Sequence, residues 1–280
     1  MSSTAGSTLQ SADRVTRAAV VLHGRPAALG SGLERLETVA AEQGVELVMT
    51  GDGQVAALPD VQVAIVLGGD GTMLRALHAF LGTGIPVIGV NFGRVGFLSA
   101  IPRDELESGV ARVFAGELEP VELATLEVEA GGQRHVAVND AVVTSGVLGR
   151  MVELEWSIGG EDFGSVPCDG LICSTPSGST AYNLSNGGPV LMWGLDAMAL
   201  TFVAPHDLRA RPFVVPRGHD LHIWNRTPDV GCAVLVDGHR VGDAGTDERV
   251  SIGLGEQRSL LGTLPEATFV RRYRQSFGSA

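Results

Sequence analysis

The stretch VQVAIVLGGDGTMLRALHAF, residues 61–80, decides the fold class. Its first part, Val61 to Leu67, is a hydrophobic run, uninterrupted from Val63, with the length and composition of a buried strand. The glycine-rich segment GGDGT follows, and after it apolar residues recur at helical spacing. The stretch therefore predicts a strand, a tight turn and a helix in succession, which is the repeating unit of an open α/β sheet.

The same alternation continues on both sides of this stretch. Ala18 to Leu22, Val45 to Met49 and Pro86 to Val90 are short apolar runs, and helical patterns lie between them. A further helix is expected to begin at Pro102 and to end near Gly116. Short strands alternating with helices predict an N-terminal α/β domain with a parallel, Rossmann-like sheet.

The second half of the chain has a different period. From Arg150 to Ile158 apolar and polar residues alternate, and Gly159-Gly160 then provides a hairpin-like break. The other strand candidates lie between Gly, Pro and Asp turns and are Pro120–Glu129, Arg134–Ser145, Asp220–Asn225, Gly231–Val236 and Arg249–Ile252. This half is therefore predicted to be a mostly-β C-terminal domain.

These patterns also predict the domain boundaries. Residues 1–13 are Ser/Thr/Ala-rich without apolar periodicity and are expected to form a disordered tail. The α/β domain is expected over residues 14–118 and the β-rich domain over residues 119–262. The last segment, 263–280, is expected to pack back on the first domain.

Composition excludes several function classes. All 20 basic side chains are Arg and no Lys occurs, so a P-loop lysine, a Schiff base and a lysine general base are impossible. The formal charge of −12 and the scattered arginines argue against nucleic-acid binding, and the apolar runs are too short for a membrane anchor. Three cysteines without CxxC spacing, and no signal-peptide pattern, predict a cytoplasmic protein with reduced thiols.

The GGDGT segment suits phosphate binding. Glycines free the backbone N–H groups to meet phosphate oxygens, and the start of the following helix adds its positive dipole end. Asp70 is the exception, because a carboxylate among phosphate-binding amides is electrostatically costly. It would either hold a divalent metal or accept a proton from an attacking hydroxyl. The alternative is a tight turn in which Asp70 is the helix N-cap.

A second polar constellation lies in the β-rich half. Residues 169–182, DGLICSTPSGSTAY, are expected to form a strand, a turn and a helix that starts near Pro176 and Ser177 and ends at Gly187-Gly188. Hydroxyl groups crowd its middle and can bind ribose and base edges; the alternative is an ordinary Ser/Thr-rich loop. Asn139-Asp140, expected within a strand, adds an amide and a carboxylate that can hold a vicinal diol.

Three ordered segments now resemble one family. GGDGTMLRA (68–76), VNDAVV (138–143) and DGLICSTPSGSTAYNLSNGGPVL (169–191) are similar to the signature segments of bacterial, ATP- or polyphosphate-dependent NAD kinases. HGRP (23–26), NFGRVGFL (91–98) and APHDLRARP (204–212) support the resemblance.

The resemblance implies phosphorylation of the adenosine ribose 2′-hydroxyl of NAD to give NADP, with ATP or polyphosphate as donor and Mg²⁺ or another divalent metal as cofactor. It implies that Asp70 is the general base, that the first domain binds the donor and the second binds NAD, and that the protein is a homodimer or homotetramer whose subunits share sites. No direct protein ligand for the metal is predicted. The residues expected to bind the nucleotides are Gly69, Gly71, Thr72, Arg75, Asn139, Asp140, Arg150, Asp169, Ser177, Thr180, Ala181, Tyr182, Asn183 and Ser185. For Arg75 a solvated helix arginine is an equal alternative.

Three positions depart from the family pattern. Asp140 stands where many members have Glu, Pro167 where some have a basic residue, and His239 where Gln is frequent. Ligand contacts at Pro167 and His239 are therefore not carried over.

Two other functions stay open at this stage. A lipid or sugar kinase would share the GGDG loop but leave residues 169–191 without a purpose. A non-catalytic NAD(P) sensor would keep the pocket but would not need a proton acceptor at Asp70.

Overall fold

The computed structural model describes residues 14–22, 29–50, 60–94 and 96–278. The expected tail (1–13) and the HGRP segment (23–26) lie outside these residues. By their internal contacts the residues form two compact units, Met1–Val121 with Leu260–Ala280, and Glu122–Ser259. Each unit has its own elements and its own core, and each is described below by itself.

The first unit is built on a sheet in the order β2-β1-β3-β4-β19-β6, with β5 paired to β4. The pairs that join β2, β1, β3, β4 and β19 are parallel. Its strands are β1 (Arg17–Leu22), β2 (Glu46–Met49), β3 (Val63–Gly68), β4 (Val87–Asn91), β5 (Ile101–Pro102), β6 (Glu119–Leu123) and β19 (Ser259–Thr263). Its helices are α1 (Gly32–Gln43), α2 (Asp70–Ala79), the 3-10 turn η2 (Arg103–Glu105), α3 (Leu106–Phe114) and α5 (Phe269–Phe277).

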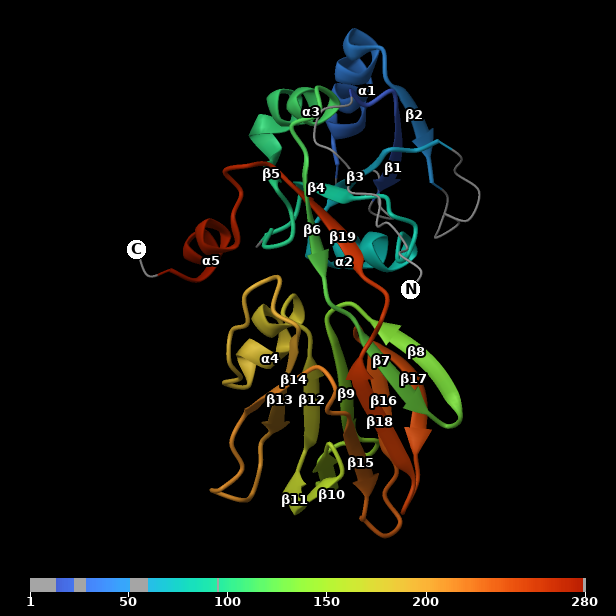
Figure 1. Cartoon of the computed structure of the whole chain (residues 1–280), viewed down its shortest axis with the longest axis vertical. Coiled ribbons are helices and arrows are strands. Elements are labelled where there is room, and N and C mark those ends of the chain that lie inside the picture. The colour runs from blue at the N-terminus through green and yellow to red at the C-terminus, as the bar shows by residue number, and fades with distance from the viewer. Residues whose placement is uncertain (1–13, 23–28, 51–59, 95, 279–280) are drawn as a thin grey trace, which may run out of the picture. The chain divides into compact units, whose positions relative to one another are not determined.

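Helices cover both faces of this sheet (Figure 1). Alternate strand residues such as Ile88 and Val90 join one hydrophobic cluster with Leu36 of α1 and Val110 of α3. Gly89 points the other way, and a Cβ there would lie 2.4 Å from the Met73 sulfur of α2. Since successive strand residues face opposite sides, α2 lies on the face away from α1 and α3. The predicted parallel α/β domain is confirmed.

The second unit consists of two antiparallel sheets, in the orders β11-β10-β15-β18-β7-β8 and β14-β13-β12-β9-β16-β17. The strands of the first are β7 (Leu126–Ala130), β8 (Gln133–Ala137), β10 (Val152–Ile158), β11 (Glu161–Cys168), β15 (Leu221–Asn225) and β18 (Arg249–Leu254). Those of the second are β9 (Asp140–Ser145), β12 (Gly170–Ser174), β13 (Ala197–Val203), β14 (Phe213–Pro216), β16 (Cys232–Val236) and β17 (His239–Ala244). Apolar residues of both sheets form one core. The predicted mostly-β domain is confirmed, and Gly159 and Gly160, both at positive φ, turn the predicted hairpin between β10 and β11.

Two long strand predictions are wrong. The run Pro120–Glu129 breaks at Ala124 and Thr125, because β6 joins the sheet of the first unit whereas β7 pairs with β18 and β8. The run Arg134–Ser145 breaks before Asp140, so Asn139 lies outside a strand and Asp140 begins β9. At this second break the backbone N–H groups of residues 138–140 bond to a side chain instead of a neighbouring strand.

The helix expected from Pro176 to Gly187 is also wrong. The structure has a 3-10 turn, η3 (Gly178–Thr180), and a single helical turn, α4 (Tyr182–Ser185). The Ser179 hydroxyl accepts from the Leu191 N–H at 2.9 Å, and the Asn183 amide donates to the Pro189 carbonyl at 2.9 Å. These bonds tie the segment to the chain that follows it, in place of a regular helical ladder.

Two further facts bear on the function classes. The three cysteines, Cys168, Cys173 and Cys232, are free and buried, and burial raises the pKa of the Cys168 thiol to about 12. They are small core residues, as predicted, and poor nucleophiles. Among the described helices, none is both long enough and apolar enough to cross a bilayer.

Candidate functional site

The GGDGT segment lies at the carboxyl end of the parallel sheet, as its pattern predicts. Strand β3 ends at Gly68, Gly69 is the N-cap, and α2 begins at Asp70. The N–H groups of Thr72 and Met73 donate to the Gly69 carbonyl at 2.9 and 3.0 Å. The N–H groups that precede them begin the helix and have no acceptor within it. The segment therefore presents backbone donors at the positive end of the α2 dipole.

The three glycines of the GGDGT segment differ in how much space a side chain would have. A Cβ at Gly68 would lie 2.6 Å from the Thr72 side chain, and one at Gly69 would lie 3.2 Å from the Cα of Gly93. A Cβ at Gly71 would have no heavy atom within 4 Å, and Gly71 is not among the residues with positive φ. Packing therefore explains Gly68 and Gly69 but not Gly71, which leaves open space where a ligand can approach the backbone.

The Asp70 carboxylate is anchored by the loop after β4. Its Oδ2 accepts from the N–H of Phe97 at 3.1 Å, and its Oδ1 accepts from the N–H of Leu98 at 2.9 Å. Asp70 is the first residue of α2 and not its N-cap, so the tight-turn alternative is wrong. Two bonds leave lone pairs free on both oxygens, and the residue is only half-buried. The carboxylate can therefore accept a further proton or hydrogen bond in a set orientation.

Thr72 and Arg75, two further predicted ligand residues on α2, have less distinctive surroundings. The Thr72 side chain packs over Gly68 and is buried. Arg75 lies on the exposed side of α2. Their contacts to a donor phosphate stay predictions.

In the second unit, the segment that carries Asn139 and Asp140 is held by Asp237. The Asp237 carboxylate accepts from the N–H groups of Val138 at 2.8 Å, Asn139 at 2.7 Å and Asp140 at 3.1 Å. The Asp237 N–H donates back to the Asp140 carbonyl at 2.9 Å. Sequence reasoning gave Asp237 no role, because its partners lie almost a hundred residues earlier. The one local indication of a structural role for Asp237 is its position in the turn that directly follows β16.

Three predicted ligand residues come together beside this segment. Asp140 at the start of β9 pairs with Ser174 at the end of β12, and Gly178 packs so closely on Asn139 that a Cβ there would lie 2.1 Å from the Asn139 carbonyl oxygen. Within the described residues, the buried Asn139 Oδ1 and Ser177 Oγ have no hydrogen-bond partner. Since buried polar atoms are nearly always bonded, these two atoms are suited to a polar ligand.

The Asp140 carboxyl group is the most perturbed acid of this cluster. Burial, and then the negative charge of Asp237, raise its pKa from 3.8 to about 7. The group is therefore close to half-protonated near neutral pH and can both donate to and accept from a ligand hydroxyl.

This raised pKa makes the effect of Asp140→Asn on stability depend on pH. Below about pH 4 the Asp140 carboxyl is neutral in the folded and the unfolded chain, so its raised pKa does not lower the stability of the fold. As the pH rises from about 4 to about 7, the unfolded chain ionises Asp140 while the folded chain keeps it protonated, so the parent loses stability. We expect Asp140→Asn, which stays neutral, to gain up to about 4 kcal/mol over the parent at pH 8.

Urea unfolding of both proteins at pH 4, 6 and 8 measures this difference, with the exposed Asp162→Asn as control. A difference that stays constant over this pH range would contradict the assignment.

The hydroxyl-rich segment is used partly by the protein itself. The Thr175 hydroxyl donates to the Val138 carbonyl at 2.7 Å, and the Ser179 hydroxyl donates to the Pro176 carbonyl at 2.8 Å. The hydroxyl groups of Thr175 and Ser179 therefore stabilise the protein itself, and their number alone does not indicate a ligand site. Asn183 is fully buried and its amide bonds to Ser179 and Thr201. The predicted ligand residues that keep exposed surface here are Thr180, Ala181, Tyr182 and Ser185.

Asp169 and Arg150 lie away from this cluster. Asp169 directly precedes β12, whereas Ser174 ends it, so the strand separates Asp169 from the Asp140 pairing position by about 17 Å at roughly 3.4 Å per residue. The carbonyl of Asp169 accepts from the Ser145 N–H at the far end of β9. Arg150 is exposed in the turn before β10. One chain therefore does not bring these two residues together with Asn139, Asp140 and Ser177.

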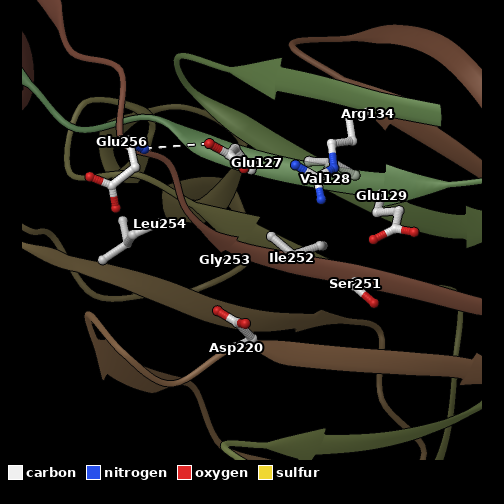
Figure 2. Close-up of a pocket in the computed structure, with 10 residues that line it drawn as sticks. All are labelled: Glu127, Val128, Glu129, Arg134, Asp220, Ser251, Ile252, Gly253, Leu254 and Glu256. Carbon is white, nitrogen blue, oxygen red and sulfur yellow. Dashed lines mark hydrogen bonds between the residues drawn. The ribbon is translucent and has the colours of Figure 1, made fainter.

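A shallow pocket on the outer side of β7 and β18 holds none of the predicted residues (Figure 2). It has a volume of about 280 Å³ and is lined by Glu127, Glu129, Asp220 and Glu256, with Arg134 as the single cation. Such a surface repels phosphate groups and is not a nucleotide site. Over the described ranges, no group of three or more His, Cys, Asp or Glu could hold a metal ion.

Comparisons with known proteins agree with the two sets of motifs. Residues 32–118 match the ATP-NAD kinase N-terminal domain, and residues 138–261 match the ATP-NAD kinase C-terminal domain. The NAD kinase of Gemmatimonas aurantiaca is 39% identical over 227 residues, which are 78% of this chain and 78% of that protein. NAD kinase 2 of Streptomyces avermitilis is 35% identical over 277 residues, or 91% of each chain.

Solved structures share the fold. The crystal structure of an NAD kinase from Archaeoglobus fulgidus in complex with ATP has a TM-score of 0.79 at 24% identity, covering 95% of this chain and 100% of that one. Yeast NADH kinase complexed with NADH has a TM-score of 0.81 at 20% identity, covering 96% and 89%. Since both domains match in order and the curated relatives extend over most of the sequence, the chain belongs to the NAD kinase family.

Proposed function

We propose that this protein transfers a phosphoryl group from ATP or polyphosphate to the 2′-hydroxyl of the adenosine ribose of NAD, with Asp70 as general base. Family membership makes it a phosphotransferase that acts on NAD. The observation that supports the role of Asp70 is its carboxylate, oriented by the Phe97 and Leu98 N–H groups at the start of α2. Backbone donors for phosphate and a carboxylate for a proton lie within one short loop.

The proposed step needs no covalent nucleophile. Asp70 takes the proton of the 2′-hydroxyl as its oxygen forms a bond to the terminal phosphorus, and the bond from that phosphorus to the bridging oxygen of the donor breaks. With ATP the products are NADP and ADP. The N–H groups at the start of α2, open to solvent at Gly71, would stabilise the phosphate charge. A bound Mg²⁺ would neutralise phosphate charge, held by the phosphates and water more than by protein groups.

The nucleotide acceptor is assigned to the second unit. The Asn139 amide oxygen, the Ser177 hydroxyl and the Asp140 carboxyl are buried polar groups that the hydroxyls of a ribose could satisfy. Tyr182, the first residue of α4, is exposed and would offer a ring for a base.

We further propose a homodimer or homotetramer. Asp169 and Arg150 lie at the opposite end of the β9–β12 pair from Asp140, and this separation supports a site to which a neighbouring subunit would contribute them. A cytoplasmic location accords with the three reduced, buried thiols.

Incubating the purified protein with each donor and each acceptor tests this function. We expect NADP from NAD with ATP or polyphosphate in the presence of Mg²⁺. If the protein phosphorylates lipids or sugars and leaves NAD unchanged, the result would favour a lipid or sugar kinase. Tight NAD or NADP binding without phosphoryl transfer from either donor would favour a sensor.

A further inference from the structure

One face of the C-terminal helix α5 lies against the loop that holds Asp70. The Phe97 ring meets the ring of Phe269 at 5.6 Å, nearly perpendicular, and the ring of Phe277 at 5.8 Å. Arg272 donates from Nη1 to the Phe97 carbonyl at 3.1 Å. Residues 269, 272 and 277 are spaced so that they share one side of a helix. Three side chains of α5 therefore converge on a single residue of the loop.

The same residue of the loop holds the Asp70 carboxylate. The N–H of Phe97 donates to Asp70 Oδ2 at 3.1 Å, while its carbonyl accepts from Arg272. Phe97 is thus held between a carboxylate and a guanidinium through its two backbone groups. A movement of α5 would move Phe97 and change the orientation of the Asp70 carboxylate.

The guanidinium of Arg272 is an unusual group for this place. Arg272 is only 4% exposed, and its Nε also donates to the Ala267 carbonyl at 2.9 Å. Burial lowers the pKa of Arg272 to about 10, and the negative charge of Asp70 opposes this decrease. The side chain therefore stays cationic at neutral pH, within the field of the Asp70 carboxylate.

A purely structural role does not account for the charge. Burying a guanidinium carries a large desolvation cost, and well-packed apolar residues often replace buried ions with no loss of stability. A long apolar side chain beside Phe269 and Phe277 would fill the space of Arg272 at lower cost. What it would lack is a cation near Asp70 and a donor to the Phe97 carbonyl.

We propose that Arg272 is a positioning residue for Asp70: it holds the Phe97 backbone that orients the carboxylate. The inference deepens the proposed function and rests on it, since it gives the proposed proton acceptor its geometry. Arg272 itself need not touch either nucleotide.

Steady-state kinetics of Arg272→Met, with Arg274→Met as the matched control, tests the proposal. Arg274 is exposed on the same helix, and its replacement changes the charge equally. We expect Arg272→Met to lower kcat by about 10-fold or more with the KM for NAD and for ATP changed less than about 3-fold. Arg272→Lys, which keeps the charge, should recover part of kcat and serves if the Met variant does not fold. A kcat of Arg272→Met, per folded enzyme, within about 2-fold of the parent would overturn the proposal.

A double-mutant cycle with Asp70→Asn separates positioning from general destabilisation. If Arg272 acts through Asp70, adding Arg272→Met to Asp70→Asn should change the residual kcat by less than about 2-fold. Multiplicative losses would indicate an independent role and overturn the proposal.

Hydrogen exchange of the Phe97 and Leu98 amides gives a readout that does not require activity. Their protection should fall in Arg272→Met and not in Arg274→Met, and unchanged protection would overturn the proposal. A parent without NAD kinase activity would overturn the proposed function, while the exchange measurement would still decide whether Arg272 positions the loop.

Discussion

Asp70→Asn is expected to lower kcat for NAD phosphorylation by about 10²-fold or more, while the dissociation constants of the nucleotides change little. An amide of the same size cannot take the proton of the 2′-hydroxyl. It can still accept one of the two backbone hydrogen bonds that the carboxylate receives from Phe97 and Leu98. The loss should therefore appear in kcat and not in KM. Steady-state kinetics together with calorimetric titration of NAD separates the two effects.

The matched control is Asp104→Asn, an equal change at an exposed carboxylate of the first unit. Its kcat should stay within about 2-fold of the parent. Turnover of Asp70→Asn at the parental rate would remove Asp70 from the role of base and leave the loop as a binding element.

Asp237→Ala is expected to raise the KM for NAD by about 10-fold or more and to lower the free energy of unfolding by about 2 to 4 kcal/mol. The substitution removes the acceptor for the N–H groups of Val138, Asn139 and Asp140. The segment would then lose the conformation that places Asn139 and Asp140 beside Ser177. Kinetics and urea unfolding measure the two effects.

Asp162→Ala is a suitable control for this substitution. The Asp162 carboxylate accepts a single backbone bond, from Gly164 at 2.8 Å, in an exposed hairpin of the same unit. Its loss should cost less than about 1 kcal/mol and leave the KM for NAD unchanged. An Asp237→Ala protein with normal KM would show that Asp140 and Asn139 do not need this support.

The sequence predicts the parts of the fold that depend on neighbouring residues. Strand β3, the GGDGT turn and α2 are each encoded by a continuous local pattern, as is the Gly159-Gly160 hairpin. The fold class follows from these patterns, because a strand buried on both faces and an alternating strand have different compositions. The position of Gly69 to Thr72 between β3 and α2 was predictable for the same reason, and their contacts to a ligand stay predictions.

What the sequence does not predict depends on distant partners. The run Arg134–Ser145 contains no Gly or Pro to mark a break, and where β8 and β9 separate the Asp237 carboxylate accepts from three of its N–H groups. Ser179 and Asn183 have polar side chains that could bind a ligand. In the structure these side chains form hydrogen bonds with the chain between Pro189 and Thr201. Arg272 stands in a helix with several arginines, and only the fold shows which one is buried.

Helix α5 is synthesised long after the loop that it contacts. Arg272 follows Phe97 by 175 residues, and β19, which completes the parallel pairing at β4, also comes from the last part of the chain. On the ribosome the N-terminal half can emerge and collapse long before either element exists. The Asp70 carboxylate therefore acquires its complete surroundings only after α5 has been synthesised, and a nascent chain that has not reached Arg272 lacks the contact from Arg272 to the Phe97 carbonyl.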